Sequence, residues 1–238
     1  MSESVGSGIF ITKGSSLRLS DLTFSVGPGG ELQGSPITLE LSYDLWPLWL
    51  RIAIQHEAMA AEARSQLEEF PGEHDERHAA ALEAETSTGM VAIAAAAFSI
   101  DAFYGATKAR IEDLRPTGTG TARYAVVAET LRRGFEMTEK GFTTLRESLK
   151  EMFKFRDLSV HPDGGFRGAV VHPVMRAGVA VPHVAFRVEN AKAVVGLAIS
   201  IVEQCSVVPK ERHKALVEWC LGISEKISEL KALRRSAF

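Results

Sequence analysis

The sequence has few cysteines: only Cys205 and Cys220 occur among its 238 residues. They fall in separate helical patterns and lack the short spacing of cysteines that bind a metal ion. A disulfide scaffold needs several cysteine pairs, and such scaffolds belong to secreted proteins. We therefore expect two reduced thiols in the core of a cytoplasmic protein.

Long hydrophobic runs are also absent. The longest, MVAIAAAAFSI, covers residues 90–100 and is followed by Asp101, whereas about 20 apolar residues are needed to span a bilayer. The opening MSESVGSG lacks the basic-then-apolar order of a secretory signal. These patterns predict a buried helix at residues 90–100, a cytoplasmic location and no membrane partner.

An excess of positive charge is missing as well, because 27 Lys and Arg residues face 30 Asp and Glu residues, for a net charge of −3. A broad grip on duplex DNA needs a strongly basic face, so we expect no such DNA partner. The HDERH segment at residues 74–78 has two histidines at helical spacing but no third ligand. We therefore expect no bound metal.

What is present is a change of hydrophobic period near residue 44. Residues 1–43 alternate apolar and polar side chains in SLRLSDLTFSV and SPITLELS, around the turn-rich GPGGELQGSP. This pattern predicts two or three antiparallel strands. A sheet of two or three strands is not stable by itself in water. We therefore expect a small β appendage that packs on the second unit, residues 44–238.

The helical period of residues 44–238 predicts a mainly α protein, a bundle of about five helices. The expected helices are 44–70, 74–111 with a candidate interruption at TSTG, 122–160, 189–206 and 210–234. Residues 162–188 are rich in glycine and proline with β-branched islands. They predict an irregular excursion or a hairpin.

Arg156 is unusual because it falls on the apolar stripe of the predicted helix 122–160. At 100° per residue, Leu145 and Leu149 each lie about 20° from it around the helix axis. An unpaired buried charge costs several kcal/mol, so Arg156 must be paired or must line a cleft. Asp101 on the preceding predicted helix is the expected partner.

His161 follows Arg156 by five residues and stands directly before Pro162. A residue before proline is disfavoured in a helix, so the helix should end near Val160 and the next turn can bring His161 back towards Arg156. The R-x(4–6)-H spacing itself is weak, since the sequence contains four instances. A structural helix end therefore remains open beside an active site.

The segment FRDLSVHP, residues 155–162, resembles the R-[polar]-x(3)-H signature of the HEPN superfamily. This superfamily comprises all-helical domains, many of them metal-independent ribonucleases. AIAAAAFSIDAFYGATKAR resembles its alanine-rich early helix, and VENAKAVVGLAISIVEQ resembles the helix after its catalytic loop. The resemblance covers about residues 85–205. Gly105 departs from it, because many relatives have a polar residue there.

The resemblance implies specific site residues. Arg156 and His161 would be catalytic, and Asp157 would orient them. We expect five further residues at the site: Asp101, Tyr104 and Ser159 in supporting roles, and His172 and His183 as candidates for lining the cleft.

The resemblance also implies a function, the cleavage of RNA by attack of its 2′-hydroxyl on the adjacent phosphate. His161 would move protons and Arg156 would stabilise phosphoryl charge, without a metal or any other cofactor. DNA would be inert because it lacks the 2′-hydroxyl. The protein would be a homodimer with both motifs in one cleft.

Domains of this kind occur in toxin–antitoxin and defence systems, where an inhibitor protein is a further partner. The main alternative is a non-catalytic helical dimer that binds a nucleotide, RNA or a protein. A third reading is a purely structural dimer, in which Asp101 neutralises Arg156.

Overall fold

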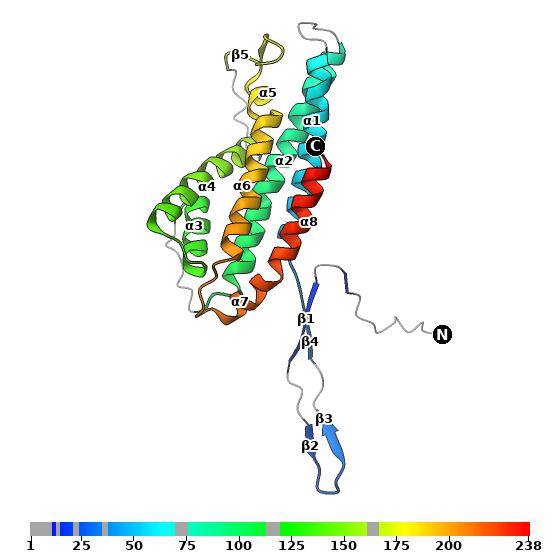
Figure 1. The fold of residues 1–238 in the computed structure, drawn as a ribbon, viewed down its shortest axis with the longest axis vertical. Coiled ribbons are helices and arrows are strands. Elements are labelled where there is room, and N and C mark those ends of the chain that lie inside the picture. The colour runs from blue at the N-terminus through cyan, green and yellow to red at the C-terminus, as the bar shows by residue number, and fades with distance from the viewer. Residues whose placement is uncertain are drawn as a thin grey trace, which may run out of the picture. The chain divides into compact units, whose positions relative to one another are not determined.

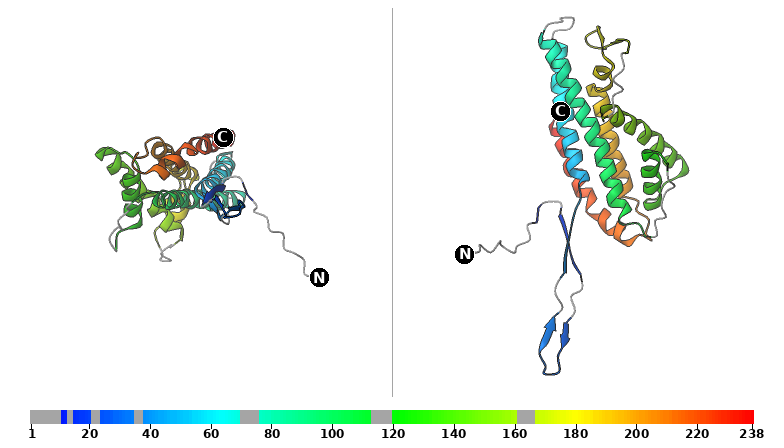
Figure 2. Two further views of the ribbon diagram at one scale, coloured as in Figure 1. Left: turned by 90° about the horizontal axis from the view of Figure 1, so that it is seen from below. Right: turned by 180° about the vertical axis from the view of Figure 1, so that it is seen from behind.

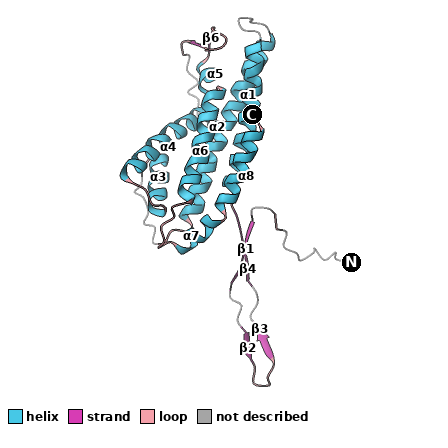
Figure 3. Cartoon of the chain, viewed as in Figure 1, coloured by secondary structure: helices cyan, strands magenta, loops and turns pink. Residues whose placement is uncertain are grey.

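The computed structural model describes residues 11–12, 15–20, 24–34, 38–69, 76–112, 120–160 and 167–238. The chain divides into two compact units, Met1–Asp44 and Leu45–Phe238. This boundary lies one residue from the one predicted. The predicted fold class, mainly α with a small antiparallel β element, is confirmed (Figure 3).

The described residues of the first unit form four short strands where two or three were expected: β1 (Ser15–Ser20), β2 (Phe24–Val26), β3 (Leu32–Gly34) and β4 (Thr38–Tyr43). The segment expected as one strand contributes both β1 and β2. β1 pairs antiparallel with β4, and β2 pairs antiparallel with β3. The packing of this unit on the bundle remains a prediction.

The second unit is a helical bundle (Figure 1). The long helices α1 and α2 form an antiparallel pair, α6 and α8 pack against it, and α3 and α4 lie on the opposite side from α8 (Figure 2). The helices are α1 (Trp46–Glu69), α2 (Glu76–Lys108), α3 (Arg123–Gly134), α4 (Glu139–Val160), α5 (Val181–Ala185), α6 (Val188–Ser206), α7 (Lys214–Leu221) and α8 (Ile223–Ser236).

An aromatic cluster joins these helices at the core. The Phe103 ring on α2 lies 6.0 Å from Trp46, 5.9 Å from Phe135 and 5.3 Å from Trp219, measured between ring centroids. Such pairs add to the large apolar area that each ring removes from water. The start of α1 and the α3–α4 connection are therefore fixed to the core near the C-terminal end of α2.

α2 is continuous, so the candidate interruption at TSTG was wrong. The hydroxyls of Thr86 and Thr88 donate to backbone carbonyls one turn earlier, at 2.7 and 2.6 Å, and are satisfied within the helix. By length and composition α2 could cross a membrane, since one 18-residue window has a mean hydropathy of 1.5. However, 56% of that window is buried inside the bundle, as a core helix requires.

The helix predicted at 122–160 is in fact two helices, α3 and α4. Phe135 is extended and forms a β-bridge with Pro209, and the Glu136 N–H donates to the Val208 carbonyl at 2.8 Å. The Thr138 hydroxyl then accepts from the Gly141 N–H at 3.1 Å, as an N-cap does. Tertiary pairing with residues 208–210 thus replaces the helical hydrogen bonds at the break.

The helix predicted at 210–234 is also divided, into α7 and α8. Residues 208–210 are engaged with the α3–α4 connection, so α7 begins only at Lys214, and Gly222 separates it from α8. The hairpin predicted within 162–188 is present as β5 (Val170–Val171) and β6 (Gly178–Val179), followed by the short α5.

Candidate functional site

Arg156 lies in the last turn of α4, at the end of the buried stripe that holds Leu149, Met152 and Phe153. Its guanidinium lies over the Phe153 ring, 4.5 Å from the centroid. The side chain is 19% exposed, so it reaches the surface from the edge of the core. A charge in this position requires partners.

Two carboxylates hold the guanidinium of Arg156. Its Nη1 donates to Asp101 Oδ2 at 3.1 Å, which confirms the predicted ion pair between α4 and α2. Its Nε and Nη2 both donate to Asp157 Oδ1, at 3.0 and 2.6 Å. Ser159 instead donates its hydroxyl to the Arg156 carbonyl at 2.6 Å, so it contacts the backbone and not the guanidinium.

Asp101 also binds a second arginine that the sequence analysis missed. Arg123, the first residue of α3, donates from Nε to Asp101 Oδ1 at 2.8 Å. Its guanidinium lies 4.5 Å from the centroid of the Tyr104 ring, and Tyr104 is buried. A signal was available: a positive charge in the first turn of a helix opposes the helix dipole and needs a reason.

The proposed histidines occupy different environments. His161 lies outside the described residues, so its relation to Arg156 remains a prediction. His183, on α5, is partly buried and shares a 2.7 Å hydrogen bond between Nδ1 and Thr86 Oγ1. His172 does not line an open cleft, because it is fully buried. The β5–β6 hairpin packs Val174 and Met175 on the apolar ends of α1 and α2 and encloses it.

A buried polar cluster lies beneath this hairpin. Glu85 on α2 is fully buried and accepts hydrogen bonds from Arg64 Nη2 at 2.7 Å and from the Val188 N–H at 2.8 Å. Arg64 on α1 also donates to Glu189 at 2.7 Å. The sequence analysis missed this cluster, although Arg64 and Glu85 both fall on the buried stripes of their helices.

His172 completes the buried cluster. Its Nδ1 accepts from the Met175 N–H at 3.3 Å, which leaves the proton of the neutral ring on Nε2. Nε2 lies 4.0 Å from Glu85 Oε2 and has no hydrogen-bond partner among the described residues. Burial lowers the pKa of His172, although Glu85 opposes this.

The lowered pKa of His172 should make the stability of the protein depend on pH. Four charged groups act on it: Glu85, Arg64, Arg187 and Glu189. Because its pKa is lower in the folded than in the unfolded protein, the unfolded chain takes up the proton first. We expect the stability margin of wild type over His172→Gln to shrink as the pH falls below 6.5. Urea unfolding of both proteins between pH 7.5 and 5 measures this, and a constant margin would contradict it.

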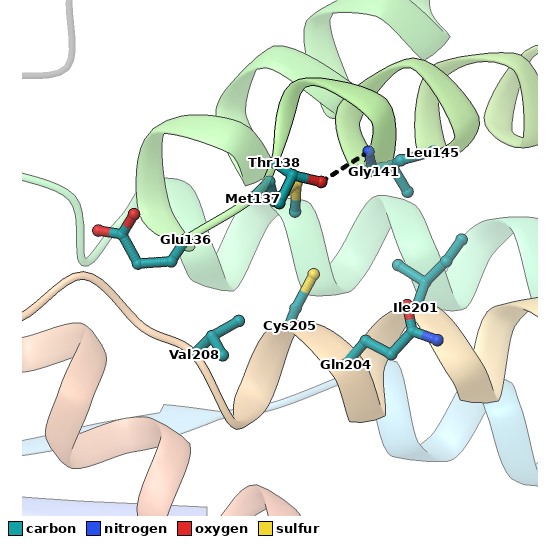
Figure 4. Close-up of a pocket in the computed structure, with 9 residues that line it drawn as sticks. All are labelled: Glu136, Met137, Thr138, Gly141, Leu145, Ile201, Gln204, Cys205 and Val208. Atoms are coloured by element: carbon teal, nitrogen blue, oxygen red, sulfur yellow. Dashed lines mark hydrogen bonds between the residues drawn. The ribbon is translucent and has the colours of Figure 1, made fainter.

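Surface hollows in the described part of the bundle include two that lie away from Arg156. One, of about 220 Å³, lies between α4 and α6 and is lined partly by Cys205 (Figure 4). Burial raises the pKa of that thiol strongly, which makes it a poor nucleophile. The other, of about 710 Å³, contains Arg234, which is held by Glu57 at 2.7 Å. Neither hollow is lined by Arg156.

Among the residues that the structure describes, no group of three or more His, Cys, Asp or Glu side chains could hold a metal ion. Both cysteines are buried and unbonded to each other, as predicted. No family model, curated protein or solved structure matches the chain. Function must therefore be inferred from the residues themselves, and the Arg156 cluster offers the most specific chemistry.

Proposed function

We propose that the chain is a metal-independent endoribonuclease of the HEPN type, acting in the cytoplasm as a homodimer. One observation carries the proposal: the guanidinium of Arg156 is partly exposed and is held in place by Asp101 and Asp157. It stands at the end of α4, five residues before His161 in the sequence. The resemblance requires an arginine and a histidine at these two positions.

In the proposed reaction, neutral His161 takes the proton of an RNA 2′-hydroxyl. The 2′-oxygen then bonds to phosphorus and the bond from phosphorus to the 5′-oxygen breaks. The departing 5′-oxygen takes a proton from the imidazolium of the second copy. Arg156 stabilises the negative charge that builds on the phosphoryl oxygens. The products are a 2′,3′-cyclic phosphate and a 5′-hydroxyl.

Asp157 has a defined part in this scheme. In the free protein it occupies the Nε–Nη2 edge of Arg156, the edge that binds a phosphate through two parallel hydrogen bonds. The Asp157 side chain is 58% exposed, so it can turn away into water. Asp101 keeps its contact with Nη1 and holds the guanidinium while the phosphate replaces Asp157.

RNA cleavage in excess chelator tests the proposal. We expect wild type to cut single-stranded RNA and to leave 2′,3′-cyclic phosphate ends, because the nucleophile lies in the substrate. Arg156→Ala and His161→Ala should each reduce the rate by about 100-fold or more. Exposed Arg146→Ala on the same helix controls for loss of a positive charge. DNA of the same sequence should remain intact.

The alternative is a non-catalytic helical dimer that binds a nucleotide, RNA or a protein. It is favoured by the fact that Nε, Nη1 and Nη2 of Arg156 all donate to carboxylates, as in a structural ion pair. RNA binding without cleavage would support it. Toxicity of wild type on expression, relieved by His161→Ala, would instead support the nuclease and would suggest an inhibitor protein as a partner.

A further inference from the structure

Arg123 is placed where a helix does not favour it. It is the first residue of α3, where a positive charge is unfavourable because it opposes the helix dipole. Only Nε is used in its bond to Asp101, and among the described residues no hydrogen bond occupies its two Nη groups. The side chain is 45% exposed. Arg123 therefore presents forked donors to solvent.

The Tyr104 ring fixes the plane of this fork. The Arg123 guanidinium lies 4.5 Å from the ring centroid, a distance at which the cation is attracted to the aromatic face. Because the group is held by the ring and by Asp101, little side-chain entropy remains to be lost when a ligand binds. A guanidinium with two anchors and free donors is suited to binding an anion.

Asp101 sets Arg123 beside Arg156. Its Oδ1 accepts from Arg123 and its Oδ2 accepts from Arg156, so one carboxylate joins two guanidinium groups from α3 and α4. One negative charge cannot balance two positive charges. Once a phosphate displaces Asp157, the group formed by these two arginines and Asp101 carries a net positive charge facing solvent.

We infer that Arg123 is a second phosphate-binding residue, which holds the RNA phosphate next to the one at Arg156. The inference rests on the proposed function, since it assumes a single-stranded RNA in this site. Two guanidiniums joined by one carboxylate match a ligand with phosphates on successive nucleotides. Arg123 would bind the strand without taking part in the chemistry, so its loss should raise KM more than it lowers kcat.

Binding of uncleavable RNA tests Arg123 apart from catalysis. The full chain is titrated into a fluorescent single-stranded RNA with 2′-O-methyl groups, at several salt concentrations. We expect Arg123→Gln to weaken binding several-fold at low salt and to reduce the slope of log K against log salt by about 0.7, the value for one phosphate contact on a single strand. Arg123→Lys should restore the slope, and Arg146→Gln should leave it unchanged.

Circular dichroism first checks that Arg123→Gln keeps its fold. If Arg123 had only a structural role, this folded variant would show the same slope of log K against log salt as wild type. An unchanged slope in Arg123→Gln would therefore overturn the inference. If the slope falls in Arg123→Gln but wild type does not cleave RNA, phosphate binding by Arg123 is supported and the proposed nuclease activity is contradicted. If wild type does not bind the RNA at all, both are wrong.

Discussion

Glu85→Ala should lower the free energy of unfolding by about 3–5 kcal/mol, the cost of removing one partner from a buried ion pair. Arg64, whose side chain is 6% exposed, would lose the carboxylate that binds its Nε and Nη2. The Val188 N–H would also lose its acceptor at the start of α6. Urea denaturation at neutral pH measures the effect as a shift of the midpoint.

Two variants make the Glu85 experiment specific. Glu83→Ala removes an exposed carboxylate from the same helix and should change stability by less than about 0.5 kcal/mol. Glu85→Gln keeps an acceptor for the Val188 N–H but removes the charge. Its free energy of unfolding should therefore lie between those of Glu85→Ala and Glu83→Ala. If Glu85→Ala proved as stable as Glu83→Ala, Glu189 and Glu68 would have to satisfy Arg64 without Glu85.

This cluster shows where sequence reasoning was incomplete. The helical period predicted α1 and α2, but it cannot reveal which charged residues meet when helices pack, and Arg64 and Glu85 were not singled out. Arg156 was predictable because an apolar stripe ended on a charge and Asp101 lay on a neighbouring alanine-rich helix. Arg123 was not predicted, because the helix was expected to run without a break from 122 to 160 and no apolar stripe drew attention to its first residues.

The break between α3 and α4 was missed for a related reason. Gly134 and Thr138 are local signals for a helix end and a helix start, yet the apolar period continues through them. A non-local contact decides that the helix ends here. Residues 208–210 form hydrogen bonds with the α3–α4 connection, and these replace the helical hydrogen bonds that are absent at the break. A local pattern cannot show that this distant segment is near.

Gly89 closes the TSTG segment, the candidate interruption of the helix, and its position in the structure leads to the second large effect. It lies within continuous α2, where the backbone of Phe186 packs directly against it. A Cβ added at Gly89 would collide with the Phe186 carbonyl oxygen. Phe186 is itself buried, and its N–H donates to the Pro182 carbonyl at 2.9 Å, so its backbone has little room to retreat.

We therefore expect Gly89→Ala to destabilise the protein by about 3 kcal/mol or more, at the upper end of overpacking effects. Gly105→Ala on the same helix is the matched control: it is exposed, and nothing lies within 4 Å of the added Cβ. There alanine should stabilise by up to about 1 kcal/mol through its higher helix propensity. In both thermal and urea unfolding, the change in stability should have opposite signs for the two variants. Equal effects at both positions would mean that α2 and the α5–α6 junction do not approach so closely in solution.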